Sequence, residues 1–413
     1  MTSKLTPKGM RDFMPEEALV REEVRDRIAG VYKKYGFMPM ETPALEYLET
    51  LRAKAGDEID KQIFILSDER MALRFDHTVP LARIASTLDM PKPFKRYAIG
   101  SVWRKEEPQH GRYREFWQAD ADIIGSPTMR AEVELLTMAK EICSAFGFED
   151  PKILLNNRKI LNGLAKALDF EDKKNEVFRL LDKIDKIGAE EVEKEIVKLL
   201  GQRGEELIII VKSGRNNEEK LATAKKYSPE GATELEEIIS SCSFPIEIDL
   251  TLVRGLGYYT GPVFEIKLSK DIGTVIAGGR YDNLISVYGR GDYATGISVG
   301  IERLITLMLE RGKNNEKKNK TIFVANAKDE QYPHALEIAK KLRAAGINCE
   351  TDLNKRNLRK QFEYVNARGI GHAIIIGEKE IASGKYKLRD MQTGKEEELN
   401  EKELIERCKK IAG

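Results

Sequence analysis

The chain has 413 residues, of which 41% are hydrophobic and 33% are charged, and its formal net charge is +1. This length predicts about two or three domains, and the composition predicts globular domains with real cores rather than disorder. A net charge so close to zero excludes an overall basic field for nucleic acid. Any polyanion must therefore be bound by local basic patches.

Cysteines, histidines and apolar runs exclude further classes of protein. The four cysteines and four histidines show no metal-binding or redox spacing, so we expect free thiols, a reducing compartment and no structural metal. The N-terminus lacks the apolar core of a signal peptide, and no apolar run approaches the roughly 20 residues of a membrane span. We therefore expect a cytoplasmic protein without a membrane partner.

The first part of the chain contains a predicted helix and a predicted pair of strands. Apolar residues recur at helical spacing between Pro15 and Tyr35, and Gly36 can end this helix. The following segment, FMPMETPALE, should be extended and is broken by two prolines. Residues 97–125 have the pattern of two strands around a polar loop. A helix is predicted after them, through MRAEVELLTMAKEICSAFG.

The remainder divides by composition. Residues 167–230 are rich in Lys, Glu, Leu and Ile at helical spacing and predict a helical insertion. Strand patterns resume at FPIEIDLTLVRG, PVFEIKL and TVIAGG, and GISVGIERLITLMLERG predicts a strand leading into a helix. The polar run 311–320 predicts a linker. Strands alternate with helices after it, which predicts a separate α/β domain.

Charged and aromatic residues crowd the predicted loop between the two strands. A charged surface hairpin is one explanation. However, strand alternation places Arg104 on an arm leading into the sheet, and it places Phe116, Gln118, Asp120 and Asp122 on one face. Polar groups on a buried strand face need partners, and a bound ligand is one candidate.

The segment LRFDHTVPLAR has two interpretations. Asp76 and Thr78 flank His77, and a carboxylate beside a hydroxyl suits an ammonium group. The same residues could cap the helix that begins near Val79. From these residues alone we favour the cap.

Three glycine-containing segments follow, and they are not nucleotide loops of the common kinds. LVRGLGYYTG places Arg254 near Tyr258 and Tyr259, AGGRYDNL contains paired glycines, and GISVGIERL places Arg303 at the start of a helix. None matches a Walker loop or a dinucleotide fingerprint. Arg303 could be a surface charge or could reach a phosphate bound over the sheet.

Taken together, these segments resemble the histidyl-tRNA synthetases, a family of class II aminoacyl-tRNA synthetases. The family's N-terminal signature is matched by PKGMRDFMP, and class motifs 1, 2 and 3 are matched by YGFMPMETPALE, VWRKEEPQHGRYREFWQADADIIG and GISVGIERL. The two signatures peculiar to the histidine enzyme are matched by LVRGLGYYTG and AGGRYDNL. The C-terminal domain resembles the anticodon-binding domain of several such synthetases.

The resemblance implies a fold and an assembly. It implies an α+β catalytic domain with an antiparallel six-stranded sheet, a C-terminal α/β anticodon-binding domain, and a homodimer built through motif 1. The implied catalytic domain has two parts, residues 1–166 and 231–310, with a helical insertion at 167–230 between them. A linker at 311–320 and the anticodon-binding domain at 321–413 follow.

The resemblance also implies an activity, that of a histidine–tRNA ligase. L-histidine and ATP would give histidyl-adenylate and pyrophosphate, and the 3′ end of histidine tRNA would then take the histidyl group. Mg²⁺ is implied with ATP, because pyrophosphate is the leaving group. The alternative is a non-catalytic paralogue, either a regulatory subunit of histidine biosynthesis or a tRNA-sensing module. Such relatives typically lose the substrate arginines, the histidine signatures or the anticodon domain, and this chain has all three.

Site residues are implied by the same matches. Arg104 and Arg254 match the catalytic pair at the α-phosphate. Contacts to histidine are implied for Asp76, Thr78, Arg104, Gln118, Asp122, Arg254, Tyr258 and Tyr259. Contacts to ATP are implied for Arg104, Glu106, Arg112, Phe116 and Arg303. The match at Asp76 and Thr78, to contacts with the α-amino group, reverses the preference for a simple cap.

Two positions depart from the family pattern. Gly257 stands where the family usually has Asp, which puts the rigidity of that loop in doubt. His77 replaces an apolar or small residue, and we expect it to point away from the substrate and to have no catalytic role.

Overall fold

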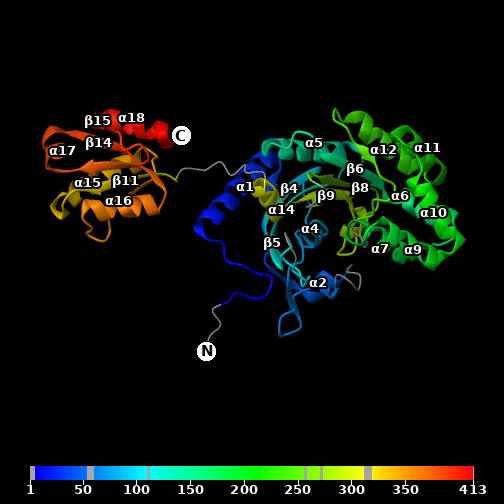
Figure 1. Ribbon diagram of the computed structural model, residues 1–413. Coiled ribbons are helices and arrows are strands. Elements are labelled where there is room, and N and C mark those ends of the chain that lie inside the picture. The colour runs from blue at the N-terminus through cyan, green and yellow to red at the C-terminus, as the bar shows by residue number, and fades with distance from the viewer. Residues whose placement is uncertain are drawn as a thin grey trace. The chain divides into compact units, whose positions relative to one another are not determined.

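The computed structural model describes residues 5–53, 60–108, 112–254, 258–269, 273–310 and 319–412. The chain divides into two compact units, Met1–Arg311 and Gly312–Gly413, each of which is described by itself (Figure 1). Within the described ranges, no helix combines the length and the apolar character needed to cross a lipid bilayer. The four cysteines all lie in described ranges and form no disulfide.

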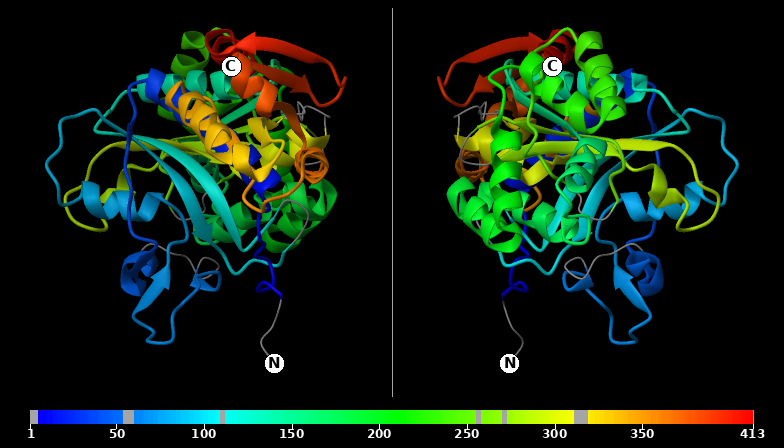
Figure 2. Two further views of the ribbon diagram at one scale, coloured as in Figure 1. Left: turned by 90° about the vertical axis from the view of Figure 1, so that its left-hand side faces the viewer. Right: turned by 90° about the vertical axis from the view of Figure 1, so that its right-hand side faces the viewer.

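An eight-stranded mixed sheet forms the centre of the first unit, with strand order β1-β4-β5-β10-β9-β8-β6-β7. In that order the strands are β1 (Met38–Pro39), β4 (Phe94–Trp103), β5 (Glu115–Ile124), β10 (Ala294–Gly300), β9 (Thr274–Arg280), β8 (Pro262–Lys267), β6 (Lys152–Asn157) and β7 (Glu247–Ile248). The predicted pair of strands within 97–125 is confirmed as β4 and β5, which run side by side as long curved strands (Figure 2).

The prediction of a six-stranded antiparallel sheet is wrong. The six longer strands, from β4 to β6 in the sheet order, do pair antiparallel with their neighbours. The two edge strands, β1 and β7, pair in parallel with β4 and β6 and make the sheet mixed. Each edge strand has only two residues, too few to show alternation, and Pro39 is tolerated in β1 because an edge strand need not donate on both sides.

The helices α1 (Pro15–Lys34), α5 (Arg130–Ala145) and α14 (Ile301–Glu310) cover much of one face of the sheet. The predicted first helix is confirmed as α1, which has acidic residues in its first turn and lysines in its last, as the helix dipole favours. Gly36 follows with a φ of +77°, a conformation that ends a helix at little cost to glycine.

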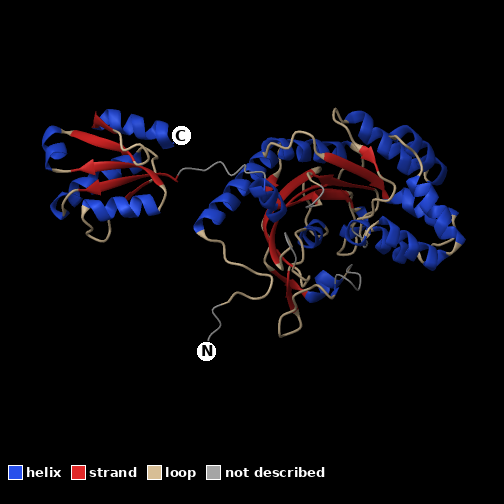
Figure 3. Cartoon of the chain, viewed as in Figure 1, coloured by secondary structure: helices blue, strands red, loops and turns tan. Residues whose placement is uncertain are grey.

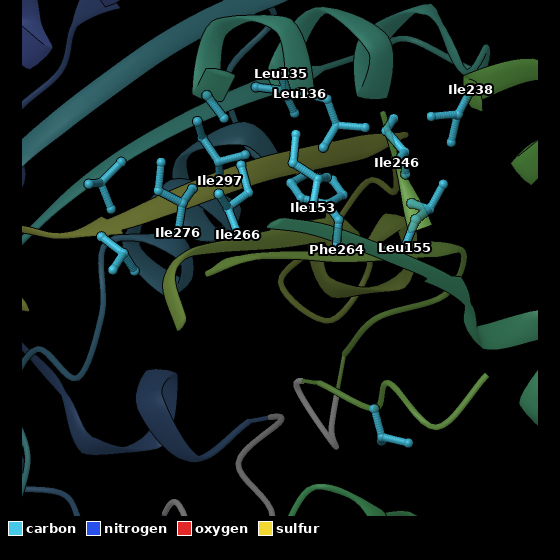
Figure 4. Close-up of a cluster of buried hydrophobic side chains, with 14 of the residues drawn as sticks. Leu135, Leu136, Ile153, Leu155, Ile238, Ile246, Phe264, Ile266, Ile276 and Ile297 are labelled. Atoms are coloured by element: carbon cyan, nitrogen blue, oxygen red, sulfur yellow. The ribbon is translucent and has the colours of Figure 1, made fainter. Parts of the chain in front are cut away.

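The core lies between these helices and the sheet. In Figure 4, Leu135 and Leu136 of α5 lie on side chains from β6, β8, β9 and β10, including Phe264 and Ile297. All four of these residues are at most 3% exposed. Burial of each such side chain stabilises the fold by roughly 1.5–3 kcal/mol, so this face of the sheet is fixed by packing.

Shorter elements pack near one end of the opposite face. They are α2 (Leu48–Arg52), α4 (Thr78–Ala85), α13 (Asp282–Ile285) and a small ribbon of β2 (Leu45–Tyr47) and β3 (Met71–Leu73). Ile124 at the end of β5 packs against Leu81 of α4 and Leu284 of α13. The polar side chains earlier in β5 lie on this same face of the sheet, and the shorter elements pack along its border.

A run of helices connects β6 to β7 (Figure 3). They are α6 (Arg158–Ala167), α7 (Lys174–Leu181), α8 (Ile184–Ile187), α9 (Ala189–Leu200), α10 (Gln202–Lys212), α11 (Asn217–Tyr227) and α12 (Pro229–Ser241). Residues of α6, α7, α9 and α12 belong to the same core as the sheet. The predicted insertion, 167–230, falls within this run, and its boundaries stay a prediction.

The second unit is an α/β sandwich, as predicted. Its five-stranded sheet has the order β12 (Cys349–Thr351), β11 (Asn319–Asn326), β13 (Ile370–Ile376), β14 (Lys385–Asp390) and β15 (Glu396–Asn400). Its helices are α15 (Tyr332–Ala344), α16 (Leu358–Ala367), α17 (Glu378–Ser383) and α18 (Glu401–Ala412), with a 3₁₀ turn at Asp329–Gln331. α15 and α18 pack on one face of this sheet, and α16 packs on the other.

Candidate active site

The polar face of β5 is confirmed as a separate face of the large sheet. Ala119 and Ala121 point into the core beneath the helices, so their neighbours Gln118, Asp120 and Asp122 point to the opposite side. Gln118 Nε2 donates to the Ser298 hydroxyl across to β10, at 2.9 Å. The sheet thus presents one amide and two carboxylates on a face where ordinary packing would place apolar groups.

Asp122 lies at the centre of a buried network. The residue is 3% exposed, Arg96 Nη2 is 2.8 Å from Oδ2, and the Tyr281 hydroxyl donates a short hydrogen bond to Oδ1. Burial raises the pKa of Asp122 to about 6, against the opposing charge of Arg96. Gly296 makes room for this carboxylate, because a Cβ there would lie 2.1 Å from Oδ1.

Arg96 and Tyr281 were not among the predicted site residues. Arg96 stands directly opposite Asp122 in the β4–β5 register, so the signal was available once the two strands were aligned. Asp120 has a similar environment, since burial raises its pKa to about 6 as well.

Asp76 caps α4 in the structure. Its Oδ1 accepts hydrogen bonds from the backbone N–H groups of Thr78, at 3.0 Å, and Val79, at 2.9 Å. The helix cap, which the residues alone favoured, is therefore present in the structure. The cap uses one carboxylate oxygen, so a contact from the other to a substrate ammonium group stays a prediction, as does the role of Thr78.

His77 points into the protein beside these residues. It is 3% exposed, and its ring Nε2 lies 3.3 Å from the carbonyl oxygen of Gly100. Burial, and then the charges of Arg74 and Arg96, lower its pKa to about 4. The ring is therefore neutral near pH 7.

The tyrosine pair lies beside Asp122. The rings of Tyr258 and Tyr259 are 4.7 Å apart, and that of Tyr258 meets the Tyr281 ring edge-on at 6.1 Å. Burial raises the pKa of Tyr259, and the negative charge of Asp122 raises it further, so the two groups are close. The glycines of this loop, Gly255 and Gly257, lie outside the described residues. The effect of Gly257 on the rigidity of the loop therefore stays a prediction.

Two arginines meet at the start of β9. Arg254 Nη2 donates to the Thr274 hydroxyl at 3.2 Å, and Arg303 Nη1 donates to the Thr274 carbonyl at 2.5 Å. Arg254 Nε also contacts the buried Glu265 carboxylate, and its Nη1 is 3.7 Å from Asp182 Oδ1. Asp182 follows α7, so the helical run supplies a charge beside Arg254. No local pattern in the sequence predicts this contact.

Two further arginines act electrostatically on Arg303. Burial, and then the charges of Arg112, Arg254 and Arg104, lower the pKa of Arg303 to about 10, while the opposing charge comes from Glu106. Like charges held this close disfavour one another unless an anion joins them. Arg254 and Arg303 are thus brought together at Thr274, the charges of Arg104 and Arg112 act on Arg303, and the region suits a polyanion.

Aromatic rings lie beside this cluster. The Arg104 guanidinium is 4.2 Å from the Phe75 ring centroid and 5.2 Å from that of Phe116, and its Nε donates to the Phe75 carbonyl at 3.2 Å. Phe116 is half-buried at the start of β5. Its ring can therefore receive a flat ligand near the arginines.

The donor set does not form a resident metal site. Among the described residues, no group of three or more His, Cys, Asp and Glu side chains could hold a metal ion. The carboxylates of Glu265 and Asp182 are already engaged by Arg254. Mg²⁺ commonly binds through substrate phosphates with few protein ligands, so a metal carried in by a polyphosphate fits this region.

Family models match almost the whole chain. The model described as "Histidyl-tRNA synthetase" matches residues 9–304, and the model described as "Anticodon binding domain" matches residues 320–411.

Individual relatives are similar over the same length. A protein from Bacteroides fragilis named histidine–tRNA ligase is 37% identical, and the match covers 97% of both chains. The solved structure of histidyl-tRNA synthetase from Nostoc sp. PCC 7120 gives a TM-score of 0.85 at 34% identity, covering 99% of this chain and 100% of that one. A structure from Bacillus halodurans is described as an ATP phosphoribosyltransferase regulatory subunit/histidyl-tRNA synthetase. It gives a TM-score of 0.76 at 25% identity, and the match covers 91% of this chain and 100% of that one.

Proposed function

The chain belongs to the histidyl-tRNA synthetase family, and on this premise we propose which of its residues carry out the reaction. It is a histidine–tRNA ligase, a class II aminoacyl-tRNA synthetase whose substrates are histidine, ATP and tRNA. The enzyme activates histidine as histidyl-adenylate and then transfers the histidyl group to the tRNA.

Arg104 and Arg254 hold the α-phosphate and the histidine carboxylate together. In the first step a carboxylate oxygen attacks the α-phosphorus, so two anions must approach each other, and fixed cations offset their repulsion. A guanidinium group stays charged and offers paired donors that match phosphate oxygens. The observation that carries this assignment is the meeting of Arg254 and Arg303 at Thr274, with the charges of Arg104 and Arg112 acting on Arg303.

The other ATP contacts lie around the same cluster. Phe116 stacks on adenine, Arg303 binds the γ-phosphate, and Glu106 and Arg112 hold the base and the bent phosphates. In support, Arg112 and Glu106 are both close enough to Arg303 to shift its pKa, in opposite directions.

Histidine binds next to the arginines on the polar face of β5. Asp122 and Tyr259 contact the imidazole, with Tyr258 beside them. Asp76, Thr78 and Gln118 contact the amino-acid end. Arg96 and Tyr281 orient Asp122, so its carboxylate is fixed before the substrate arrives. A site that hydrogen-bonds its substrate can reject an isostere lacking those groups by roughly 10⁴-fold, because its own polar groups would be left unpaired.

Mg²⁺ enters with ATP and is held by the phosphates rather than by a resident cluster of side chains. When bound, it neutralises charge on the pyrophosphate leaving group. The roles assigned to the side chains above do not depend on its position.

The enzyme is a cytoplasmic homodimer that pairs through motif 1. Met38, Leu45 and Tyr47 lie in or beside the edge strands of that motif and are 58%, 41% and 63% exposed, as expected of an apolar surface that a partner covers. Cytoplasmic location follows from the reaction, which serves translation.

The domain proposal assigns a role to each unit. Residues 1–166 and 231–310 form the catalytic domain, 167–230 a helical insertion and 311–320 a linker. Residues 321–413 bind the anticodon, in line with the family model that matches 320–411.

The regulatory alternative has little support. The Bacillus halodurans relative carries both names, and this chain is less similar to it than to the Nostoc synthetase. No observation on the described residues favours a role without catalysis, and the clustered arginines suit the chemistry.

Replacement of Arg254 tests the site assignment. We expect Arg254→Ala to slow adenylation, measured by histidine-dependent pyrophosphate exchange, by about 10²–10³-fold, as for other donors aimed at developing charge. Calorimetry should show that histidine binding largely survives. If the alanine variant is unstable, Arg254→Lys replaces it, because lysine keeps a positive charge beside Glu265. The matched control is Arg25→Ala, at an arginine on the outer side of α1. Equal losses of adenylation and histidine binding would contradict the assignment.

A further inference from the structure

The N-terminal signature segment, Lys8–Phe13, lies against the described parts of the loop between β4 and β5, residues 104–108 and 112–114. The Arg114 N–H donates to the Gly9 carbonyl at 2.8 Å, and Lys8 Nζ is 2.9 Å from Glu107 Oε2. Gly9 has a φ of +82°, and a Cβ there would lie 2.7 Å from Cγ of Arg114 and 2.8 Å from Cγ of Pro108. Only glycine allows this approach without moving the loop.

Stacked arginines and rings extend the contact. The guanidinium carbon of Arg11 lies 4.6 Å from the ring centroid of Tyr113 in the loop and 4.4 Å from that of Phe13. The guanidinium carbon of Arg21 in α1 lies 3.6 Å from the ring centroid of Phe13 and 4.2 Å from that of Trp117 in β5. The five side chains form one alternating stack, in which each guanidinium is attracted to the faces of two rings.

The stack is anchored at its buried end. Arg21 Nη2 is 3.0 Å from Glu302 Oε1, and the Glu302 carboxylate also accepts from the Trp117 N–H, at 3.1 and 3.0 Å. Glu302 is 4% exposed. It precedes Arg303, which is assigned above to the γ-phosphate, so the anchor and that contact share one turn of α14.

At its other end the segment holds the part of the loop that faces ATP. Arg114, which the Gly9 carbonyl fixes, donates from Nε to the Glu106 carbonyl at 3.0 Å. The Arg114 carbonyl accepts from the Arg104 N–H at 2.8 Å. The nucleotide contacts Glu106 and Arg112 therefore lie in a loop whose position depends on residues 9 and 11.

We propose that Gly9 and Arg11 are positioning residues for ATP. They hold the loop in the conformation in which Glu106 and Arg112 meet the nucleotide. This inference rests on the proposed function, because it takes those two residues as ATP contacts. Apart from Arg104, which contacts both substrates, the proposed histidine contacts come from the region of α4, from β5 and from the segment before β8. Removing either positioning residue should therefore weaken ATP binding more than histidine binding.

A purely structural role predicts a different result. If the segment only attached α1 to the sheet, its loss would lower thermal stability and would affect both substrates alike. The two readings are therefore separated by comparing the KM for ATP with the KM for histidine in the same variant.

The test uses Gly9→Ala and Arg11→Ala in the full-length enzyme. We expect each to raise the KM for ATP in pyrophosphate exchange by about ten-fold or more, with the KM for histidine within about two-fold of wild type. Arg11→Lys should restore part of the ATP affinity, since an ammonium keeps the charge but not the planar stack. Arg25→Ala, which removes an exposed arginine of α1, should leave both KM values unchanged.

Two outcomes would overturn the inference: a parallel rise of both KM values, or an unchanged KM for ATP in both variants. If Gly9→Ala does not fold, Arg11→Ala alone decides between them. A wild-type enzyme without histidine-dependent exchange would instead contradict the proposed function, so the two failures are distinguishable.

Discussion

Substitution of Gly296 by alanine should weaken histidine binding through Asp122. Gly296 faces Asp122 across β5 and β10, and a Cβ at this position would lie 2.1 Å from Oδ1 and 2.8 Å from Cγ of the carboxylate. The backbone there does not have a positive φ, so alanine itself fits the strand and the effect is purely steric.

The size of the effect follows from this overlap. Carbon and oxygen atoms approach to about 3.3 Å, so the carboxylate has to move by about 1 Å. A hydrogen bond to a charged group contributes roughly 1.5–3 kcal/mol, and 1.4 kcal/mol is a factor of ten. We therefore expect the KM for histidine to rise by about 10–150-fold, while the KM for ATP stays close to wild type.

Pyrophosphate exchange with histidine and ATP varied separately measures both constants. Gly300→Ala is the matched control on the same strand, because the nearest atom to its Cβ would be 3.6 Å away. In an Asp122→Ala background, Gly296→Ala should cost little more, since its target is gone. Additive losses in the double variant, or a rise in the KM for ATP, would refute the reasoning.

Three further predictions follow from other parts of the molecule. Phe116→Ala should raise the KM for ATP about ten-fold, since stacking of a base on an aromatic ring contributes roughly 1–3 kcal/mol, and Phe116→Tyr should not. His77, whose pKa is lowered to about 4, stabilises the native state above pH 6.5 and loses this contribution as the pH falls towards 4. Urea unfolding should therefore show wild type losing about 2–3 kcal/mol more than His77→Gln between pH 7 and pH 4.5; equal losses would contradict it. Tyr47→Glu should convert the proposed dimer to monomer in sedimentation experiments, and an unchanged mass would argue against pairing through motif 1.

Elements with a strong local signal could be predicted from the sequence. α1 combines a long helical period, a proline in its first turn and a glycine after its last, and it was found where these signals place it. The edge strands of the large sheet could not be predicted, because β1 and β7 have two residues each and are defined by their neighbours rather than by their own pattern.

The site divides in the same way. Alternation along β5 predicted the shared face of Gln118, Asp120 and Asp122, since a strand fixes the direction of each side chain. The contacts of Arg254 with Glu265 and Asp182 join distant segments, and no local pattern predicts them. The cap made by Asp76 could be predicted from its neighbours because it is entirely local.

We expect this site to activate histidine and no other amino acid. Pyrophosphate exchange into ATP with each standard amino acid in turn tests it most directly. We predict exchange with histidine alone, because the imidazole is the group that Asp122 and Tyr259 are placed to bind. No exchange from a folded protein, or comparable exchange with another amino acid, would contradict the account.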